Sequence, residues 1–107
     1  MTRRRDLAAA AELFKVLSSA SRLELLAHLS DSPESVTGLT ELTGMSQPLV
    51  SQHLRTLRSA GLVSVERHGR DAEYRLLDHH VTHIVGDAVA HIEEGHDRPA
   101  LAEGTHS

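Results

Sequence analysis

The stretch of residues 45–63 constrains the fold of this chain most strongly, because it combines a helix start, a helical repeat of apolar residues and a helix stop. Ser46 is a favourable N-cap, and Pro48 falls in the first turn, where a missing backbone N–H costs nothing. The apolar positions at helical spacing are Val50, Leu54 and Leu57. Gly61 is typical of a helix end, so we expect one helix between Ser46 and Gly61.

The other face of this helix is polar and carries side-chain types that suit base edges and phosphates. Its candidate DNA-binding residues are Gln47, Ser51, Gln52 and Arg55. Just before it, residues 36–43 form a short helical pattern that Gly44 ends. A short helix, a tight turn with glycine and a second helix make up a helix-turn-helix. A polar face is also the ordinary solvated side of a helix, so this helix alone leaves DNA binding open.

After Gly61 the apolar period changes from helical to alternating, which predicts a β-hairpin of about five residues on each side. The turn is expected at residues 69–71. Positive side chains on and around the tip are Arg67, Arg70 and Arg75, together with His68. The hairpin is either a solvated element or a wing that contacts phosphate or the minor groove. A helix-turn-helix followed by a basic wing favours DNA binding, with Arg67 and Arg70 as candidate contacts.

Three further helical patterns lie at residues 6–17, 21–29 and 78–94. The last one carries a continuous apolar stripe, formed by Val81, Ile84, Val85, Ala88, Val89 and Ile92. Such a terminal helix needs a partner surface, and a second copy of the chain is the simplest one. We therefore expect a mainly α fold with a small β-hairpin, a winged helix-turn-helix that dimerises through its first and last helices. The expected domain spans residues 1–95, followed by a flexible histidine-containing tail at residues 96–107.

Composition and charge limit the classes of function. The 107 residues contain no cysteine, which excludes disulfides and thiolate metal sites. We expect a cytoplasmic protein, because no apolar run approaches the roughly 18 residues of a membrane span and the N-terminus lacks an apolar signal segment. The net charge is −4, yet residues 46–75 hold five basic and three acidic residues, a balance of +2, where phosphate contact is predicted. The arginines at residues 3–5 are either a phosphate-seeking arm or a solubilising tail.

Histidine is concentrated near the C-terminus, where six of the nine histidines follow Asp78. Candidate metal ligands at the two ends of the last helix are Asp78, His80, His91 and Glu94. His80 and His91 are about 16 Å apart on a helix that rises about 1.5 Å per residue, so they cannot bind one ion within a chain. Two copies of the helix packed antiparallel would bring Asp78 and His80 of one copy beside His91 and Glu94 of the other. Each of the two resulting sites suits zinc, nickel or cobalt.

A resemblance to a known family agrees with this layout. The sequence SQPLVSQHL at residues 46–54, followed by LRSAGLV at residues 57–63, resembles the ArsR/SmtB family of metal-responsive winged-helix regulators. The resemblance covers about residues 7–94. In that family the last helix carries Asp-x-His, ten residues and His-x-x-Glu or His, and the matching positions here are Asp78, His80, His91 and Glu94. The resemblance implies a homodimer that binds a palindromic operator and changes its DNA affinity when metal binds between the subunits.

The resemblance also limits which metals are expected to bind. The family's other common site uses cysteines on the first helix of the helix-turn-helix, where residues 34–38 read ESVTG here, so thiolate sensing of arsenic, cadmium or lead is not expected. The sequence is also similar to actinobacterial nickel and cobalt sensors of the family, in which tail histidines enlarge the coordination shell. This similarity makes His96 and His106 additional candidate ligands. Nickel is slightly favoured over zinc.

Other interpretations stay open at this point. His79, His83 and Asp87 follow one another at intervals of four residues, as either an intrachain metal site or an exposed polar stripe. A metal-blind winged-helix module that binds DNA or protein is the main alternative function. A zinc hydrolase is disfavoured, because so short a chain has no second domain to form a pocket and a closed four-ligand site leaves no position for water.

Overall fold

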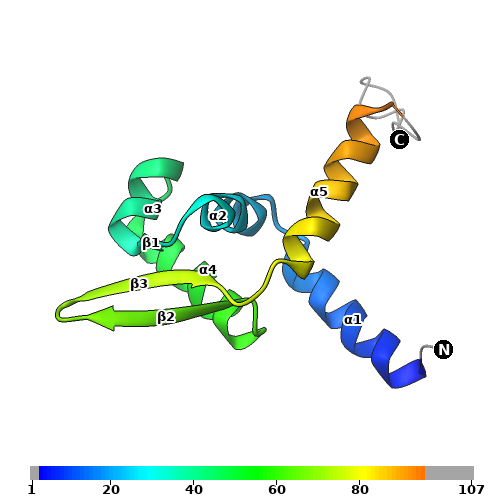
Figure 1. The fold of residues 1–107 in the computed structure, drawn as a ribbon, viewed down its shortest axis with the longest axis horizontal. Helices are drawn as coiled ribbons and strands as arrows, with labels where there is room; N and C mark the ends of the chain where they lie inside the picture. Colours follow the sequence, from blue (N-terminus) through cyan, green and yellow to red (C-terminus); the bar gives the residue numbers. More distant parts are fainter. Residues whose placement is uncertain (1–2, 96–107) are drawn as a thin grey trace.

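The structure, a computed structural model, describes residues 3–95 as five helices and a three-stranded sheet. The helices are α1 (Arg4–Leu17), α2 (Ala20–Asp31), α3 (Val36–Thr43), α4 (Gln47–Ser59) and α5 (His80–Glu93), and the strands are β1 (Glu34–Ser35), β2 (Val63–His68) and β3 (Asp71–Leu76). In Figure 1, α2, α3, α4 and the sheet form one body. The wing of β2 and β3 projects to one side, and α1 and α5 diverge on the other. The predicted mainly α winged helix-turn-helix is confirmed.

Serine caps fix where the helices of the helix-turn-helix begin. Ser46 Oγ accepts the backbone N–H of Leu49 at 3.3 Å, so α4 starts with the predicted cap. Ser19 and Ser35 cap α2 and α3 in the same way. Beyond the end of α4, Gly61 has a φ of 77°, a conformation that glycine adopts without a steric penalty. Both ends of α4 are therefore set by the local residues that the sequence indicates.

The core is a cluster of leucine and valine side chains from α2, α3, α4 and the base of the wing, and it also includes Leu17 of α1 and Val81 of α5. Its most enclosed members are Leu25, Leu26, Leu39, Val50, Leu54, Leu57 and Val63. Three of them, Val50, Leu54 and Leu57, form the apolar face predicted for α4. Burying each such side chain contributes about 1.5–3 kcal/mol, which fixes the opposite face of α4 towards solvent.

The sheet has the antiparallel order β1-β3-β2. Gly69, with a φ of 67°, and Arg70 form the wing turn, and Asp71 already belongs to β3, so the turn is one residue shorter than predicted. β1 was not predicted, because its two residues pair with Tyr74 and Glu73 far along the chain.

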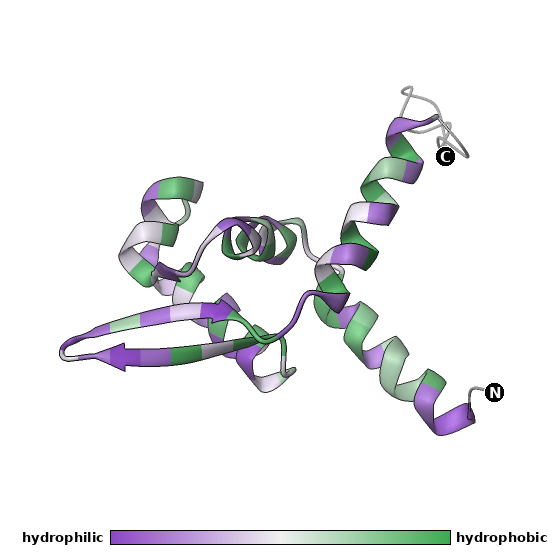
Figure 2. Cartoon of the chain, in the orientation of Figure 1, coloured by the Kyte–Doolittle hydropathy of each residue, from purple (hydrophilic) through white to green (hydrophobic). Residues whose placement is uncertain are grey.

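α1 and α5 leave much of their apolar surface uncovered. The exposed apolar side chains on these two helices, with their exposed fractions, are Leu7 (58%), Phe14 (52%), Ile84 (41%), Val89 (47%) and Ile92 (51%). Figure 2 shows apolar residues recurring along both helices. α1 begins at Arg4, two residues earlier than predicted, so Arg4 and Arg5 belong to a helix and not to an arm. Within residues 3–95, no helix has the length and apolar character needed to cross a membrane.

Candidate nucleic-acid interface and metal-binding helix

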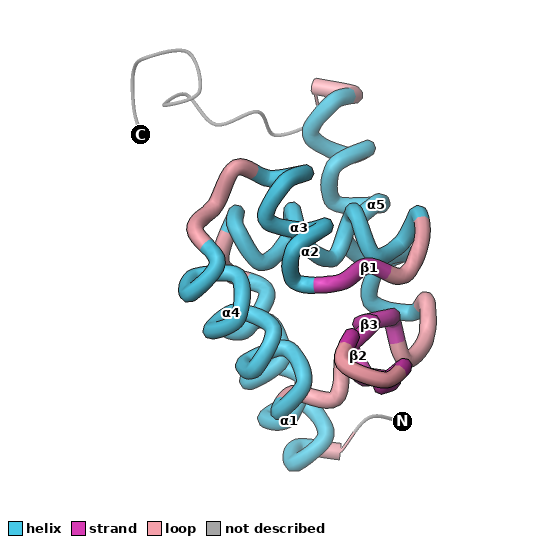
Figure 3. The backbone as a smooth tube through the Cα atoms, turned by 90° about the vertical axis from the view of Figure 1, so that its left-hand side faces the viewer, coloured by secondary structure: helices cyan, strands magenta, loops and turns pink. Residues whose placement is uncertain are grey.

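α4 presents its predicted DNA-contacting face to solvent, along one edge of the molecule in Figure 3. Gln47, Gln52 and Arg55 are exposed and Ser51 is half-buried. Within residues 3–95 none of these four side chains takes part in a hydrogen bond or an ion pair. The core anchors the other side of the helix, so the face keeps its direction while its polar groups stay available for a ligand.

The positive charge of the wing lies mainly on two arginines. Arg67 and Arg70 are exposed and, in the described part of the chain, belong to no ion pair. The Arg75 guanidinium instead lies 3.1 Å from Glu66 Oε1 and 2.9 Å from Glu73 Oε1. The expectation that Arg75 adds positive charge for a phosphate contact is therefore wrong, because two carboxylates neutralise it.

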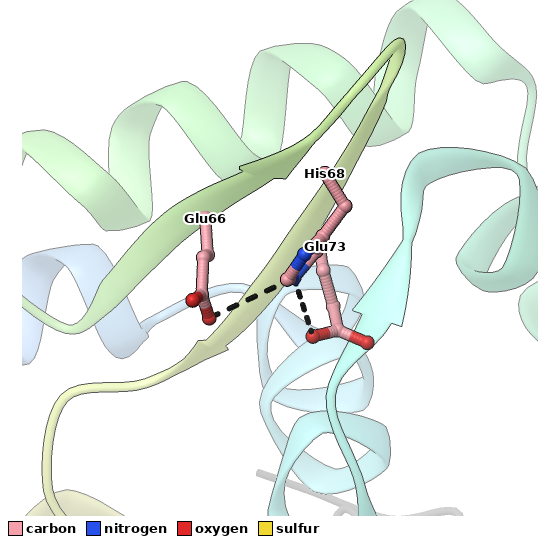
Figure 4. A group of neighbouring side chains, drawn as sticks. All are labelled: Glu66, His68 and Glu73. Atoms are coloured by element: carbon pink, nitrogen blue, oxygen red, sulfur yellow. Dashed lines mark ion pairs between the residues drawn. The ribbon is translucent and has the colours of Figure 1, made fainter.

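Among the described residues, one group of three histidine and carboxylate donors lies close together, and it is on the wing (Figure 4). His68 Nε2 is 3.8 Å from Glu66 Oε1 and 3.7 Å from Glu73 Oε1. This group was not predicted, because it depends on the strand register that sets Glu66 opposite Glu73. Arg75 already binds both carboxylates, and a metal ion would have to compete with it. We therefore assign the group to the ion-pair network of the wing.

The first half of the predicted metal site lies at the start of α5. Asp78 Oδ1 accepts the backbone N–H of His80 at 2.9 Å and lies 3.3 Å from His80 Nδ1. The N-cap position of α5 belongs to His79, and Asp78 binds the helix from one residue earlier. Both side chains are exposed. Two ligands of a tetrahedral zinc ion, at about 2.0–2.1 Å from the metal, are themselves about 3.3 Å apart, so this pair of donors fits a divalent metal.

The second half lies at the other end of the same helix. His91 is in the last turn of α5 and Glu94 follows that turn directly. α5 is continuous between the two halves, so His80 and His91 are about 16 Å apart along its axis. One chain therefore places the two predicted donor pairs at opposite ends of α5 and does not bring the four side chains together.

The remaining histidine predictions have different outcomes. His79, His83 and Asp87 do not form a group of close donors in the described part of the chain. His96 and His106 lie outside the described residues.

The sequence of this chain matches one protein family and several of its members. The model of the family described as "Bacterial regulatory protein, arsR family" matches residues 19–65, from the cap of α2 into the wing. The HTH-type transcriptional repressor SmtB of Mycobacterium tuberculosis is 47% identical over 91 residues, which cover 85% of this chain and 67% of the relative. The HTH-type transcriptional regulator NmtR of the same organism is 42% identical over 86 residues, which cover 80% of this chain and 72% of the relative.

Solved structures agree with the sequence relatives. The solution structure of apo-NmtR has a TM-score of 0.73 at 38% identity and covers 88% of this chain and 79% of that chain. The homodimeric winged helix-turn-helix DNA-binding domain Mb0332 of Mycobacterium bovis has a TM-score of 0.72 at 28% identity and covers 86% of this chain and 89% of that chain. SmtB is described as a transcriptional repressor and NmtR as a transcriptional regulator, and neither description supports the zinc hydrolase. The chain belongs to the arsR family of bacterial regulatory proteins.

Proposed function

We propose that this chain is a homodimeric DNA-binding transcriptional regulator whose operator affinity is controlled by a divalent metal, nickel or zinc, held between the subunits. The observation that carries the proposal is the placement of two donor pairs at opposite ends of α5, a helix whose apolar face is uncovered. The relatives described as a transcriptional repressor and a transcriptional regulator support DNA as the partner.

The proposed DNA contacts come from α4 and the wing. The face of α4 that we assign to the major groove consists of Gln47, Ser51, Gln52 and Arg55. Amide and guanidinium groups offer the paired donors and acceptors that base edges require. Arg67 and Arg70 bring unneutralised positive charge to the phosphates, which adds affinity without sequence preference. Two copies related by a two-fold axis would read a palindromic operator.

The proposed dimer surface is formed by α1 and α5. An apolar groove between them is lined by Phe14, Leu17, Leu23, Ile84, Val85, Ala88, Val89 and Ile92. Covering apolar surface is favourable by about 25 cal/mol per Å². A second copy is the partner that we propose, because the structurally similar Mb0332 domain is homodimeric and most soluble oligomers are symmetric dimers.

The proposed ligands of each metal ion come from both subunits. Asp78 and His80 of one subunit would meet His91 and Glu94 of the partner subunit. Two imidazole nitrogens and two carboxylate oxygens suit nickel and zinc, and cobalt also accepts this set. In addition, His96 and His106 are proposed as the ligands that would enlarge the shell around nickel.

The metal would supply a cross-link between the two copies of α5, and the chain itself connects α5 with the DNA-binding face. Val81 at the start of α5 belongs to the same core cluster as Leu26 of α2 and Leu54 of α4. A change in the angle between the subunits is therefore passed through a packed core to the two copies of α4. Ligand binding shifts such an equilibrium only when its affinity differs between the two arrangements, and that difference sets the change in operator affinity.

A mobility-shift titration tests this function on DNA taken from upstream of the protein's own coding region. We expect the metal-free protein to bind this DNA, and its affinity to change about tenfold or more when nickel or zinc is added. Binding that neither metal alters would indicate the metal-blind winged-helix module. Absence of specific DNA binding under both conditions would contradict the proposal as a whole.

Replacement of Arg55 by alanine is expected to weaken operator binding about tenfold, because one charged contact to the DNA is lost. The slope of log affinity against log salt concentration should decrease by about one if Arg55 contacts a phosphate, and stay unchanged if it reads a base. Fluorescence anisotropy at several salt concentrations measures both quantities. Lys15→Ala on α1 removes another exposed positive charge as a control and should leave both unchanged. If the native protein and Arg55→Ala bound the operator equally well, the recognition face would have to lie elsewhere.

A further inference from the structure

One side chain joins three helices beside the recognition face. Arg22 of α2 donates from Nε to the backbone carbonyl of Val16, in the last turn of α1, at 2.7 Å. Its Nη1 lies 3.5 Å from Nδ1 of His53 in the middle of α4. The backbone of Arg22 is itself held, because its N–H donates to the cap Ser19 Oγ at 3.2 Å. The guanidinium thus stands between a helix of the proposed dimer surface and the helix of the proposed DNA contacts.

Leu17 at the end of α1 shares the core with the buried face of α4, whereas the rest of α1 is separated from α4 by a groove. A groove of about 540 Å³ runs between them, lined by Ala9, Glu12, Leu13 and Val16 from α1 and by Arg55, Thr56, Ser59 and Ala60 from α4. Val16, which accepts the hydrogen bond from Arg22, also lines this groove. Arg22 is therefore the polar connection at the place where α1 approaches α4.

This connection depends on a neutral imidazole. A guanidinium has donors only, so His53 Nδ1 must carry a lone pair to accept from it, with the ring proton on Nε2. Burial, and after it the positive charge of Arg22, lower the pKa of His53 below its ordinary value of 6.5. The folded protein thus binds this proton less tightly than the unfolded chain does, and its stability decreases as the pH falls below about 6.5. Protonation removes the acceptor and sets two positive charges against each other.

Arg22 is the charged group that faces His53 and acts on it from a neighbouring element. The other ionisable side chains on the helices around it are Arg4, Arg5, Asp6, Glu12 and Lys15 of α1, Glu24, His28 and Asp31 of α2, Glu41 of α3, and Arg55 and Arg58 of α4 itself. Lys15 lies 3.4 Å from Glu12, and His28 lies 3.9 Å from Glu24. Among these groups, Arg22 is the one whose charge lowers the pKa of His53.

We propose that Arg22 and His53 are positioning residues for the recognition helix, and that protonation of His53 releases α4 from the end of α1 and weakens operator binding. The inference rests on the proposed DNA contacts of α4. Three of them, Ser51, Gln52 and Arg55, are within two residues of His53 in the sequence, so a shift of α4 at this point changes the positions of all three side chains.

Operator binding by metal-free protein, measured by anisotropy at pH 7.5 and pH 5.5, tests this role. His53→Asn keeps an acceptor near the position of Nδ1 and cannot be protonated, whereas His53→Leu keeps bulk without an acceptor. We expect His53→Asn to bind about fivefold more tightly than His53→Leu at pH 7.5. From pH 7.5 to pH 5.5 the native protein should lose about fivefold relative to His53→Asn. His28→Asn, a partly exposed histidine of α2, should keep the native pH profile.

The outcomes separate the inference from the proposed function. Equal affinities of His53→Asn and His53→Leu at pH 7.5, or a native pH profile in His53→Asn, would overturn the positioning role while leaving DNA binding intact. Failure of the native protein to bind the operator at pH 7.5 would instead remove the proposed function. Circular dichroism at both pH values shows that each variant is folded, so that a loss of binding reports on the position of α4.

Discussion

Replacement of His91 by alanine is expected to lower the affinity for nickel and zinc by at least about 100-fold and to abolish the effect of metal on operator binding. Loss of a partner that only supports a metal ligand already costs about 10–100-fold, so loss of a ligand should cost at least as much. DNA binding by the metal-free variant should stay close to native, since His91 lies at the far end of α5. Isothermal titration measures the first effect, and mobility shift with and without metal measures the second.

Two other histidines serve as matched controls for His91. His83→Ala lies on the same helix and tests whether the polar stripe with His79 and Asp87 binds metal. His68→Ala tests the group on the wing, where Arg75 already pairs with both carboxylates. We expect both variants to bind one metal ion per subunit with native affinity. A His91→Ala protein that binds as tightly as native, or a His83→Ala protein that does not, would rule out the ligand set at the ends of α5.

A mixture of two inactive variants tests whether each site is shared between subunits. One variant carries Asp78→Ala and His80→Ala, and the other carries His91→Ala and Glu94→Ala. Neither binds metal tightly alone, yet a mixed dimer combines the intact pair of each at one of its two sites. After unfolding and refolding together, the mixture should regain tight sites, about one per mixed dimer. Absence of any regained binding would show that the ligands do not come from both subunits.

Local sequence was sufficient for the elements and the core of this fold. The cap at Ser46, the stop at Gly61 and the buried face of α4 depend on residues within one or two turns of each other, so spacing predicts them. β1 was not predicted, because a strand of two residues is too short to show an alternation of apolar residues. It is a strand only because it pairs with β3. Contacts between distant segments were missed for the same reason, as between Arg22 and His53, which are 31 positions apart.

In the candidate site too, local features were predicted and contacts between distant residues were not. The metal donors all follow one helix, so helical rise predicts two half-sites, and the helix is continuous between them. The charges of the wing depend instead on which residues face each other across two strands. The shorter turn sets Glu66 opposite Glu73, beside Arg75, and so neutralises an arginine that composition alone counts as positive. The local balance of charged residues in the sequence therefore predicts the exposed charge of a helix better than that of a hairpin.

Replacement of Val89 by glutamate is expected to separate the dimer and to remove operator binding at protein concentrations where the native protein binds fully. Val89 exposes 47% of its surface, and it lines both the groove against α2 and the groove against α1. Burying an unpaired carboxylate there costs about 2 kcal/mol or more in each subunit. Because the substitution occurs once in each subunit, it should raise the dissociation constant of the dimer about 1000-fold. Analytical ultracentrifugation over a range of concentrations measures this change.

Leu42→Glu is the matched control, because Leu42 is an equally exposed leucine (50%) on α3, away from α1 and α5. It should leave the dissociation constant of the dimer unchanged. The monomeric Val89→Glu protein should keep its fold, since the core of α2, α3 and α4 does not include Val89. It should also lose tight metal binding, because no partner subunit supplies the second donor pair. A monomer that still binds nickel or zinc as tightly as the native protein would place the metal site within one chain and contradict the antiparallel arrangement of α5.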